Sequence, residues 1–122
     1  MATVRRLGGR TVLVADAQDA PLDLRGLKDL LMEGHGAGAS CVVVDTALLE
    51  PRFFDLRSGV AGEILQATVT YQLPMAVVGP LPEPAASSSA FAALVRESNR
   101  GRHHWFAADL HDLETRLHAV GP

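Results

Sequence analysis

Short apolar runs alternate with amphipathic stretches along this 122-residue chain. An apolar run of four to eight residues between turn signals is typical of a buried strand, whereas apolar residues three and four positions apart indicate one face of a helix. The strand pattern occurs at residues 3–7, 11–15, 41–44, 74–78 and 103–107. The helix pattern occurs at residues 24–34, 58–71, 90–101 and 110–120. Strand and helix signals therefore alternate after an initial pair of strands.

Turn and capping residues separate these segments. Residues 8–10, with the sequence Gly-Gly-Arg, predict a hairpin between the first two strands. Asp23 and Asp109 each precede a helix pattern, where a carboxylate can accept hydrogen bonds from free backbone N–H groups. The glycine run 34–38 predicts the end of the first helix, and the proline-rich loop 79–89 leads into the third.

The predicted order of elements is β-β-α-β-α-β-α-β-α. A helix-length connection between two strands favours parallel pairing with a right-handed crossover, and the helices then pack on the sheet. The fold class is therefore α/β, a single domain over residues 1–122 with a mostly parallel sheet and an N-terminal hairpin. The predicted core consists of apolar residues at the inward positions of these elements: Val12, Val14, Leu27, Val43, Ile64, Val77, Leu94 and Leu117.

Composition narrows the classes of protein. Apolar residues make up 48% and charged residues 20%, which indicates a globular chain rather than a disordered one. The net charge of −3 argues against binding to nucleic acid or to a membrane surface. No apolar run approaches the ~20 residues of a membrane span. The single cysteine, Cys41, is consistent with a reducing cytosol, so a cytoplasmic location is expected.

The sequence contains none of the common catalytic or ligand-binding motifs. There is no Gly-Lys-Ser/Thr phosphate loop and no Gly-x-Ser-x-Gly elbow. The glycine run 34–38 follows a helix and precedes a strand, the reverse of the order in a dinucleotide fingerprint. His103 and His104 are strand neighbours that point to opposite faces, and Cys41 lies in an apolar run where a thiol is usually a small buried hydrophobe. We therefore predict no catalytic residue, no metal site and no cofactor.

The segment 53–66 combines apolar helix spacing with polar residues and two glycines. Gly59 and Gly62 each cost about 1 kcal/mol relative to alanine in a helix interior, so we expect both where the backbone closely approaches a neighbour. The other members of this candidate binding surface are Asp55, Arg57, Ser58, Glu63 and Gln66. A plainer interpretation is that these polar residues cap the helix or face solvent.

A second polar segment, residues 97–102, ends the third helix pattern. Its candidate site residues are Glu97, Asn99, Arg100 and Arg102. Arginine forks at this position could contact an anion or a partner protein. Basic residues at a helix C-terminus also complement the helix dipole, so a solvated helix end explains the same pattern. Both interpretations stay open on the sequence alone.

Four parts of the chain resemble one bacterial family. They are the run FFDLRSGVAGEILQ at 53–66, Tyr71, the run AVVG at 76–79 and the run ESNRGR at 97–102. The family is the domain-of-unknown-function family 4180, and the resemblance extends over nearly the whole chain. It implies no assigned activity. More distantly, the order of elements is similar to that of the STAS domain, the fold of anti-sigma-factor antagonists.

The STAS resemblance implies a regulatory position. In STAS antagonists a strand ending in Asp leads through a short loop to a helix start of the type Asp-Ser-Ser-Gly, where a Ser or Thr is the phosphorylation switch. Here Asp45 ends the strand and residues 55–59 would occupy the helix start, which implies Ser58 as the phosphorylation candidate. The chain departs from that pattern because Asp55 lies three residues before Ser58 and the connection contains Pro51.

Three functions are compatible with this pattern. The favoured one is a non-catalytic regulatory or protein-interaction module with Ser58 as its candidate phosphorylation switch, so the expected partner is a protein. The alternative is a small-molecule-binding protein or cofactor-free enzyme that uses Glu63, Glu97 and an arginine, and it requires both carboxylates in one pocket. The third is a structural subunit with an exposed apolar patch. A small-molecule ligand and a homo-oligomer stay open, whereas nucleic acid and membrane are not expected as partners.

Overall fold

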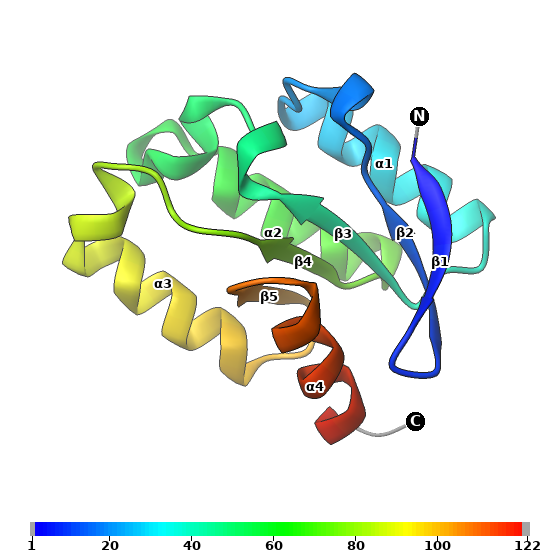
Figure 1. Cartoon of the computed structure of the whole chain (residues 1–122). Coiled ribbons are helices and arrows are strands. Elements are labelled where there is room, and N and C mark those ends of the chain that lie inside the picture. The colour runs from blue at the N-terminus through cyan, green and yellow to red at the C-terminus, as the bar shows by residue number, and fades with distance from the viewer. Residues whose placement is uncertain (1, 121–122) are drawn as a thin grey trace.

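Within residues 2–120, five strands form one sheet whose spatial order is their order in the sequence. The computed structural model describes the backbone of these residues and the side chains of residues 2–117. β1 (Thr3–Leu7) pairs antiparallel with β2 (Arg10–Val14). β3 (Cys41–Asp45), β4 (Met75–Val78) and β5 (His104–Ala107) follow, each parallel to the strand before it (Figure 1). The predicted α/β class, with an N-terminal hairpin and a mostly parallel sheet, is confirmed.

Four α-helices within the same residues cover the two faces of this sheet. They are α1 (Leu24–Gly36), α2 (Val60–Tyr71), α3 (Ser89–Arg100) and α4 (Leu110–Val120). Each of the first three connects a strand to the strand beside it, and the sheet always grows in the same direction. Because such crossovers are right-handed, all three helices lie on one face of the sheet. α4 follows the last strand and packs on the other face. None of these helices combines the length and apolar character needed to cross a lipid bilayer.

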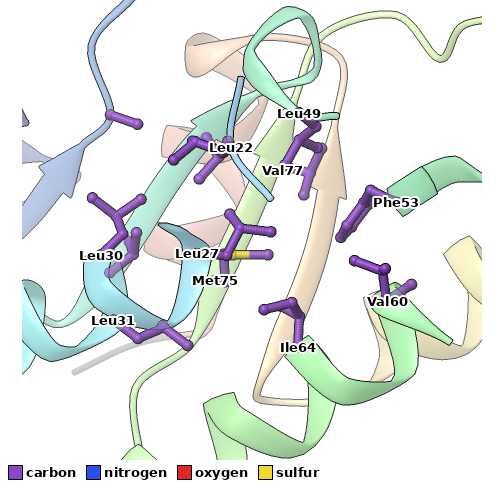
Figure 2. Packing of buried hydrophobic residues seen from close by; sticks show 14 of the residues in the cluster. Leu22, Leu27, Leu30, Leu31, Leu49, Phe53, Val60, Ile64, Met75 and Val77 are labelled. Atoms are coloured by element: carbon purple, nitrogen blue, oxygen red, sulfur yellow. The ribbon is translucent and has the colours of Figure 1, made fainter. Parts of the chain in front are cut away.

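The core consists of two apolar layers, one on each face of the sheet. Alternate residues of β3 serve both layers, since Val42 and Val44 face α1–α3 whereas Cys41 and Val43 face α4. Figure 2 shows the first layer, in which leucines of α1 and Ile64 of α2 meet the strands. Burial of each Val, Leu or Ile side chain contributes about 1.5–3 kcal/mol of transfer free energy, so these two layers dominate the stability of the fold.

Six of the eight predicted core residues are buried, and the other two are half-buried against the same layers. The two are Val14 and Leu94. Val14 is the last residue of β2. Leu94 lies on α3, which packs against the outermost strand, β5. Each therefore has neighbours on fewer sides than a residue in the middle of the sheet.

The boundaries of two helices differ by two residues from the predicted ones. α1 continues to Gly36, inside the glycine run, and the chain turns at Gly38, whose φ is 70°. There Ala39 N donates a hydrogen bond to Gly34 O at 2.9 Å. α2 begins at Val60 rather than two residues earlier, because Gly59 has a φ of 80° and only the residues after it are helical.

Candidate functional site

The parallel strands β2–β5 end at one edge of the sheet, termed the carboxyl edge, and begin at the opposite edge, termed the amino edge. The two longest connections, residues 46–59 and 79–88, are neighbours at the carboxyl edge (left in Figure 1). The connections at the amino edge have two to four residues. Binding residues are concentrated on loops that a rigid scaffold positions, so the candidate site is sought between these two connections.

The β3–α2 connection is a folded wall rather than a free loop. It contains three successive 3-10 turns: Thr46–Leu48, Pro51–Phe54 and Leu56–Ser58. Phe53 is completely buried and lies beside Val60 of α2 (Figure 2). Leu22 N donates to Leu48 O at 2.7 Å, and Glu50 N donates to Leu22 O at 3.0 Å. The wall is therefore anchored both to the core and to the preceding connection.

The β4–α3 connection forms the opposite wall. Pro82 and Pro84 restrict its backbone because each proline ring fixes φ. Ser88 ends the connection and caps α3, since its Oγ accepts a hydrogen bond from Phe91 N at 3.1 Å. This wall is also fixed by local structure.

An open groove of about 740 Å³, termed the carboxyl-edge groove, lies between the two connections. Its apolar lining residues are Leu49, Pro51, Phe54, Leu56, Pro82, Pro84, Ala85 and Ala90. Its polar lining residues are Thr46, Asp55, Arg57, Glu83 and Ser88. A mostly apolar concavity with a few polar groups is the usual composition of a binding site, and typical sites have volumes of about 300–1,000 Å³.

The two connections meet at Gly79 and Thr46. Gly79 has a φ of 117°, and a Cβ atom there would lie 2.7 Å from Thr46 Oγ1. Only glycine combines this backbone conformation with so close an approach. Thr46 is itself buried and lines the groove. The last residue of the AVVG segment therefore brings the two walls together.

Three predicted site residues, Asp55, Arg57 and Ser58, lie together at the end of the first wall. The Ser58 hydroxyl is within donating distance of Arg52 O (2.6 Å) and Asp55 O (2.7 Å), and it accepts from Val60 N (3.2 Å). Asp55 Oδ1 accepts from Arg57 N at 3.1 Å. The Asp55–Arg57 ion pair (3.6 Å) is solvent-exposed and contributes about 0–1 kcal/mol. The capping interpretation of Asp55 and Ser58 thus describes their contacts.

The expectation that Gly59 and Gly62 lie at close approaches is wrong. A Cβ atom at either position would meet no atom within 4 Å. Gly59 is explained by its positive φ, and Gly62 is exposed on α2. Close approach occurs instead at Gly34 in α1, where a Cβ would lie 2.8 Å from Val42 Cγ2 and 2.9 Å from Leu73 Cδ2. The sequence alone does not distinguish a crowded glycine from an exposed one, because the difference depends on which face of the helix packs against the core.

Glu63 and Gln66 are exposed and line a separate hollow of about 280 Å³ between α1 and α2. Lys28 and Tyr71 also line this hollow. It belongs to the outer surface of the helix layer, and neither Glu63 nor Gln66 lines the carboxyl-edge groove. The structure therefore divides the predicted segment 53–66 between two surfaces.

The segment 97–102 joins the end of α3 to β5. Asn99 Oδ1 accepts a hydrogen bond from Phe106 N at 2.8 Å, and Asn99 O accepts from the Arg116 guanidinium at 2.8 Å. Trp105 Nε1 donates to Gly101 O at 2.8 Å. β5 is the last strand of the sheet, so its outward N–H groups need acceptors other than a strand. Asn99 therefore supplies such an acceptor and joins the end of α3 to β5.

Glu97, Arg100 and Arg102 are exposed at the amino edge, where Arg100 pairs with Glu97 at 3.4 Å. A 12-residue helix such as α3 is about 18 Å long. The start of α2 lies at the carboxyl edge and the end of α3 at the amino edge. The structure thus separates Ser58 from these arginines, and it does not bring Glu63 and Glu97 into one pocket.

Of the two neighbouring histidines, His104 is the buried one, and it lies next to the first wall. Its ring packs edge-to-face on Phe106 (5.0 Å between centroids) and on Phe53 (6.3 Å). Nδ1 lies 3.5 Å from Ser98 Oγ, and Nε2 has no hydrogen-bond partner among the described residues. Burial lowers the pKa of His104 to about 4, so the imidazole is neutral near pH 7. Alternation along the strand identifies one inward histidine but does not say which of the pair it is.

Cys41 is buried in β3, and this burial raises the pKa of its thiol to about 12. It is therefore a small apolar residue of the α4 face, as predicted. In the part of the chain that the structure describes, no group of three or more His, Cys, Asp or Glu residues could hold a metal ion.

The sequence pattern of residues 79–89 indicates only a connection, so it does not predict the second wall of the groove. A topological signal existed, since this loop follows β4 at the same edge as the connection that follows β3. Two long neighbouring connections at one edge of a sheet are a candidate location for a site even without a motif. The side chains that line it could not be chosen without coordinates.

The fold and the groove define a small α/β domain with a mostly apolar groove at the carboxyl edge of a parallel sheet. The model of the family described as "Domain of unknown function (DUF4180)" matches residues 7–117, and the chain belongs to this family. No curated protein and no solved structure matches the chain. The predicted family resemblance is therefore confirmed, whereas the similarity to the STAS domain stays a prediction.

Proposed function

We propose that this protein is a non-catalytic binding module that receives a segment of a partner protein in the carboxyl-edge groove. The observation that carries the proposal is the groove itself, with about 740 Å³ of open volume and eight apolar lining residues. Apolar side chains that enter it leave water, which contributes about 25 cal/mol for each Å² buried. A bound segment with two or three such side chains gains specificity from their spacing along the groove.

The walls of the groove are preorganised, which favours binding. Phe53 and Phe54 are both buried and anchor the first wall. Prolines and the Ser88 cap hold the second. A surface that already has its bound shape loses little conformational entropy on association, so more of the contact free energy appears as affinity.

The polar groups of the lining serve the fold, which supports binding rather than catalysis. Asp55 accepts from Arg57 N, and Ser88 accepts from Phe91 N. Glu83 accepts from the Ser87 hydroxyl at 2.9 Å. A nucleophile or general base needs a side chain that is free to reach a reacting atom. A binding module needs no such constellation.

A protein segment suits the groove better than a small molecule that Glu63 and Glu97 would hold, because Glu63 lies on the outer side of α2 and Glu97 at the amino edge, and neither lines the groove. Side chains at the rim also extend into solvent. Leu56 is 38% exposed, and the Arg57 side chain is 94% exposed. Such side chains can contact a partner that continues beyond the groove, as a polypeptide does.

Ser58 is the regulatory position of this proposal. A phosphate on its hydroxyl would remove the hydrogen bonds to Arg52 O and Asp55 O and would place negative charge beside these carbonyl oxygens. We expect the wall to shift and partner binding to weaken. The switch would then act through the shape of the wall, and not through a phosphate that the helix start simply accommodates.

Two arginine substitutions on one helix test the groove. Ala90 and Ala92 are both exposed on α3, and Ala90 lines the groove whereas Ala92 does not. The tagged protein is expressed in its native host, and co-purified proteins are quantified by mass spectrometry. Ala90→Arg should fill the groove and abolish capture of the partner, whereas Ala92→Arg should retain it. Thermal melts of both variants show that each is folded, and a partner that Ala90→Arg retains equally well contradicts the proposal.

Photo-crosslinking locates the contact, and Ser58→Asp tests the switch. A photoreactive residue in place of Leu56, at the rim, should crosslink to the captured partner. The same residue in place of Val69, which is 50% exposed on α2, should not. Ser58→Asp should weaken capture severalfold relative to Ser58→Ala. Equal capture by the two serine variants would remove the switch while leaving the groove proposal intact.

A further inference from the structure

We propose that the partner segment is cationic as well as apolar: its apolar side chains enter the carboxyl-edge groove, and its lysine or arginine side chains contact the acidic connections around it. The inference rests on the proposed function and adds the chemistry of the partner. The observation that supports a cationic partner is the unequal distribution of charge between the two edges of the sheet.

Acidic residues are concentrated at the carboxyl edge. The four connections at this edge, together with the last residue of β3, contain eight of the chain's 14 acidic residues. These eight are Asp16, Asp19, Asp23, Asp45, Glu50, Asp55, Glu83 and Asp109. The same segments contain two basic residues, Arg52 and Arg57. The edge therefore carries an excess of negative charge larger than the net charge of −3 on the whole chain.

Both arginines are engaged with carboxylates of their own connection. Arg52 pairs with Glu50 at 2.7 Å, and the hydrogen bond and charge of Glu50, with a further contribution from Asp23, raise the pKa of Arg52. Arg57 lies 3.6 Å from Asp55. Within residues 2–117, no ion pair balances the charge of Glu83 on the opposite wall.

Local hydrogen bonds and helix dipoles do not cancel this charge. Asp45 accepts from Ala47 N at 2.9 Å and Glu83 accepts from the Ser87 hydroxyl at 2.9 Å, and both carboxylates keep their formal charge. All four helices begin at the carboxyl edge, and each N-terminus is equivalent to about +0.5 charge, or about two positive charges together. Eight acidic against two basic groups leave six negative charges, so the field stays negative.

The connections at the amino edge lack this excess of negative charge. These connections, residues 8–9, 37–40, 72–74 and 101–103, contain no Asp or Glu and one arginine, Arg102. A cationic segment is therefore attracted to the edge that contains the groove and not to the other. Complementary charge raises the rate of encounter and selects the orientation of docking, whereas an acidic segment would be repelled by the connections that flank the groove.

The inference is tested by selecting random 12-residue peptides, displayed on filamentous phage, against the full-length protein, with the Ala90→Arg variant as the counter-selection. We expect the peptides that require the groove to be enriched in Lys or Arg and in large apolar residues relative to the starting library. Groove-dependent peptides that are neutral or acidic would overturn the charge inference while leaving the proposed function standing. A selection without groove-dependent peptides would overturn both.

The most enriched peptide, made synthetically, provides the quantitative test by fluorescence polarisation. Glu83→Gln should weaken its binding about two- to fivefold at low salt, the effect of losing one exposed charge contact. The effect should shrink as added salt shortens the Debye length from about 10 Å at 0.1 M to about 3 Å at 1 M. Glu33→Gln is the matched control, since Glu33 is exposed on the last turns of α1 at the amino edge. Equal effects of the two variants would overturn the inference.

Discussion

The two edges of the sheet differ in what their connections contribute. At the amino edge, connections of two to four residues reverse the chain, and their hydrogen bonds close helix ends against strands, as Trp105 Nε1 does on Gly101 O. At the carboxyl edge, the 14-residue connection 46–59 adds three 3-10 turns and two buried phenylalanines, and its outer side lines a groove. A groove forms at this edge because its connections are longer than is needed to join a strand to the next helix.

The same comparison explains the two polar segments that stood out in the sequence. Residues 55–58 lie at the carboxyl edge, and three of them line the groove. Residues 97–102 lie at the amino edge, where Asn99 and Gly101 fasten α3 to β5. A polar cluster beside a helix end thus lines a groove in one case and joins a helix to a strand in the other, and the edge on which it lies distinguishes the two.

Phe53→Ala should have the largest effect. Phe53 is completely buried beneath the first wall, and truncation of a buried phenylalanine lowers the free energy of unfolding by about 3–5 kcal/mol. Urea denaturation measures the loss. Hydrogen exchange should show reduced protection in residues 46–59 with little change at the amino edge. Leu56→Ala, at a half-exposed rim position, is the control and should cost less than about 1 kcal/mol. Equal loss of protection at both edges would show that the wall is not a separate unit.

Acid should weaken the protein through His104, which begins β5 and contacts Phe53 of the carboxyl-edge wall. Burial lowers its pKa from 6.5 to about 4, so the folded state binds this proton less readily than the unfolded state. The free energy of unfolding therefore keeps its full value above pH 6.5 as far as His104 is concerned. It falls by about 3 kcal/mol in total as the pH is lowered towards 4. Urea denaturation at several pH values measures it. His104→Phe should remove this part of the pH dependence, and an unchanged dependence in that variant would contradict the assignment.

Gly79→Ala should cost more than Gly38→Ala. Both glycines have a positive φ, which costs about 1–2 kcal/mol for a residue with a Cβ. At Gly79, on the carboxyl edge, the Cβ would also meet Thr46 Oγ1 at 2.7 Å, whereas at Gly38, on the amino edge, it would meet nothing within 4 Å. We expect a loss of about 2–3 kcal/mol for the first and about 1 kcal/mol for the second, measured as free energies of unfolding. Equal losses would mean that the two walls separate easily at this contact.

Gly62→Ala should have the smallest effect and the opposite sign. Gly62 is exposed on α2 with free space around it, so alanine should raise the free energy of unfolding by up to about 1 kcal/mol through its higher helix propensity. Gly34→Ala is the contrasting change, because its Cβ would lie 2.8 Å from Val42, and it should lower stability by about 1–3 kcal/mol. Thermal melts of the two variants give the signs. A lower melting temperature for Gly62→Ala would show that α2 has a contact there that needs glycine.

Much of the fold could be predicted because its signals are local. Four consecutive apolar residues at 41–44 indicated a strand that both faces cover, and all four are buried. Asp23 and Asp109 were expected to cap helices, and they accept from Gly26 N and Asp112 N, each at 2.8 Å. Periodicity and capping act over one or two turns of chain, so the residues themselves are sufficient evidence.

The candidate site was predictable only in part. Asp55 and Arg57 line the groove, but Pro82 and Glu83 on the opposite wall were not anticipated. The two walls are about 30 residues apart in the sequence, and they meet because β3 and β4 are neighbours in the sheet. Contact between such segments depends on strand order and loop shape, which no local pattern encodes.

The sequence by itself determined the order of strands and helices, the α/β class and the family, because apolar spacing and capping residues act on neighbouring positions. Only the tertiary structure decided which connections face each other, that Gly34 rather than Gly62 is crowded, and that His104 is the buried histidine of its pair. These features follow from contacts between residues far apart in the chain. These contacts contribute to the free energy of folding only after the sheet has formed and brought the two residues of each contact together.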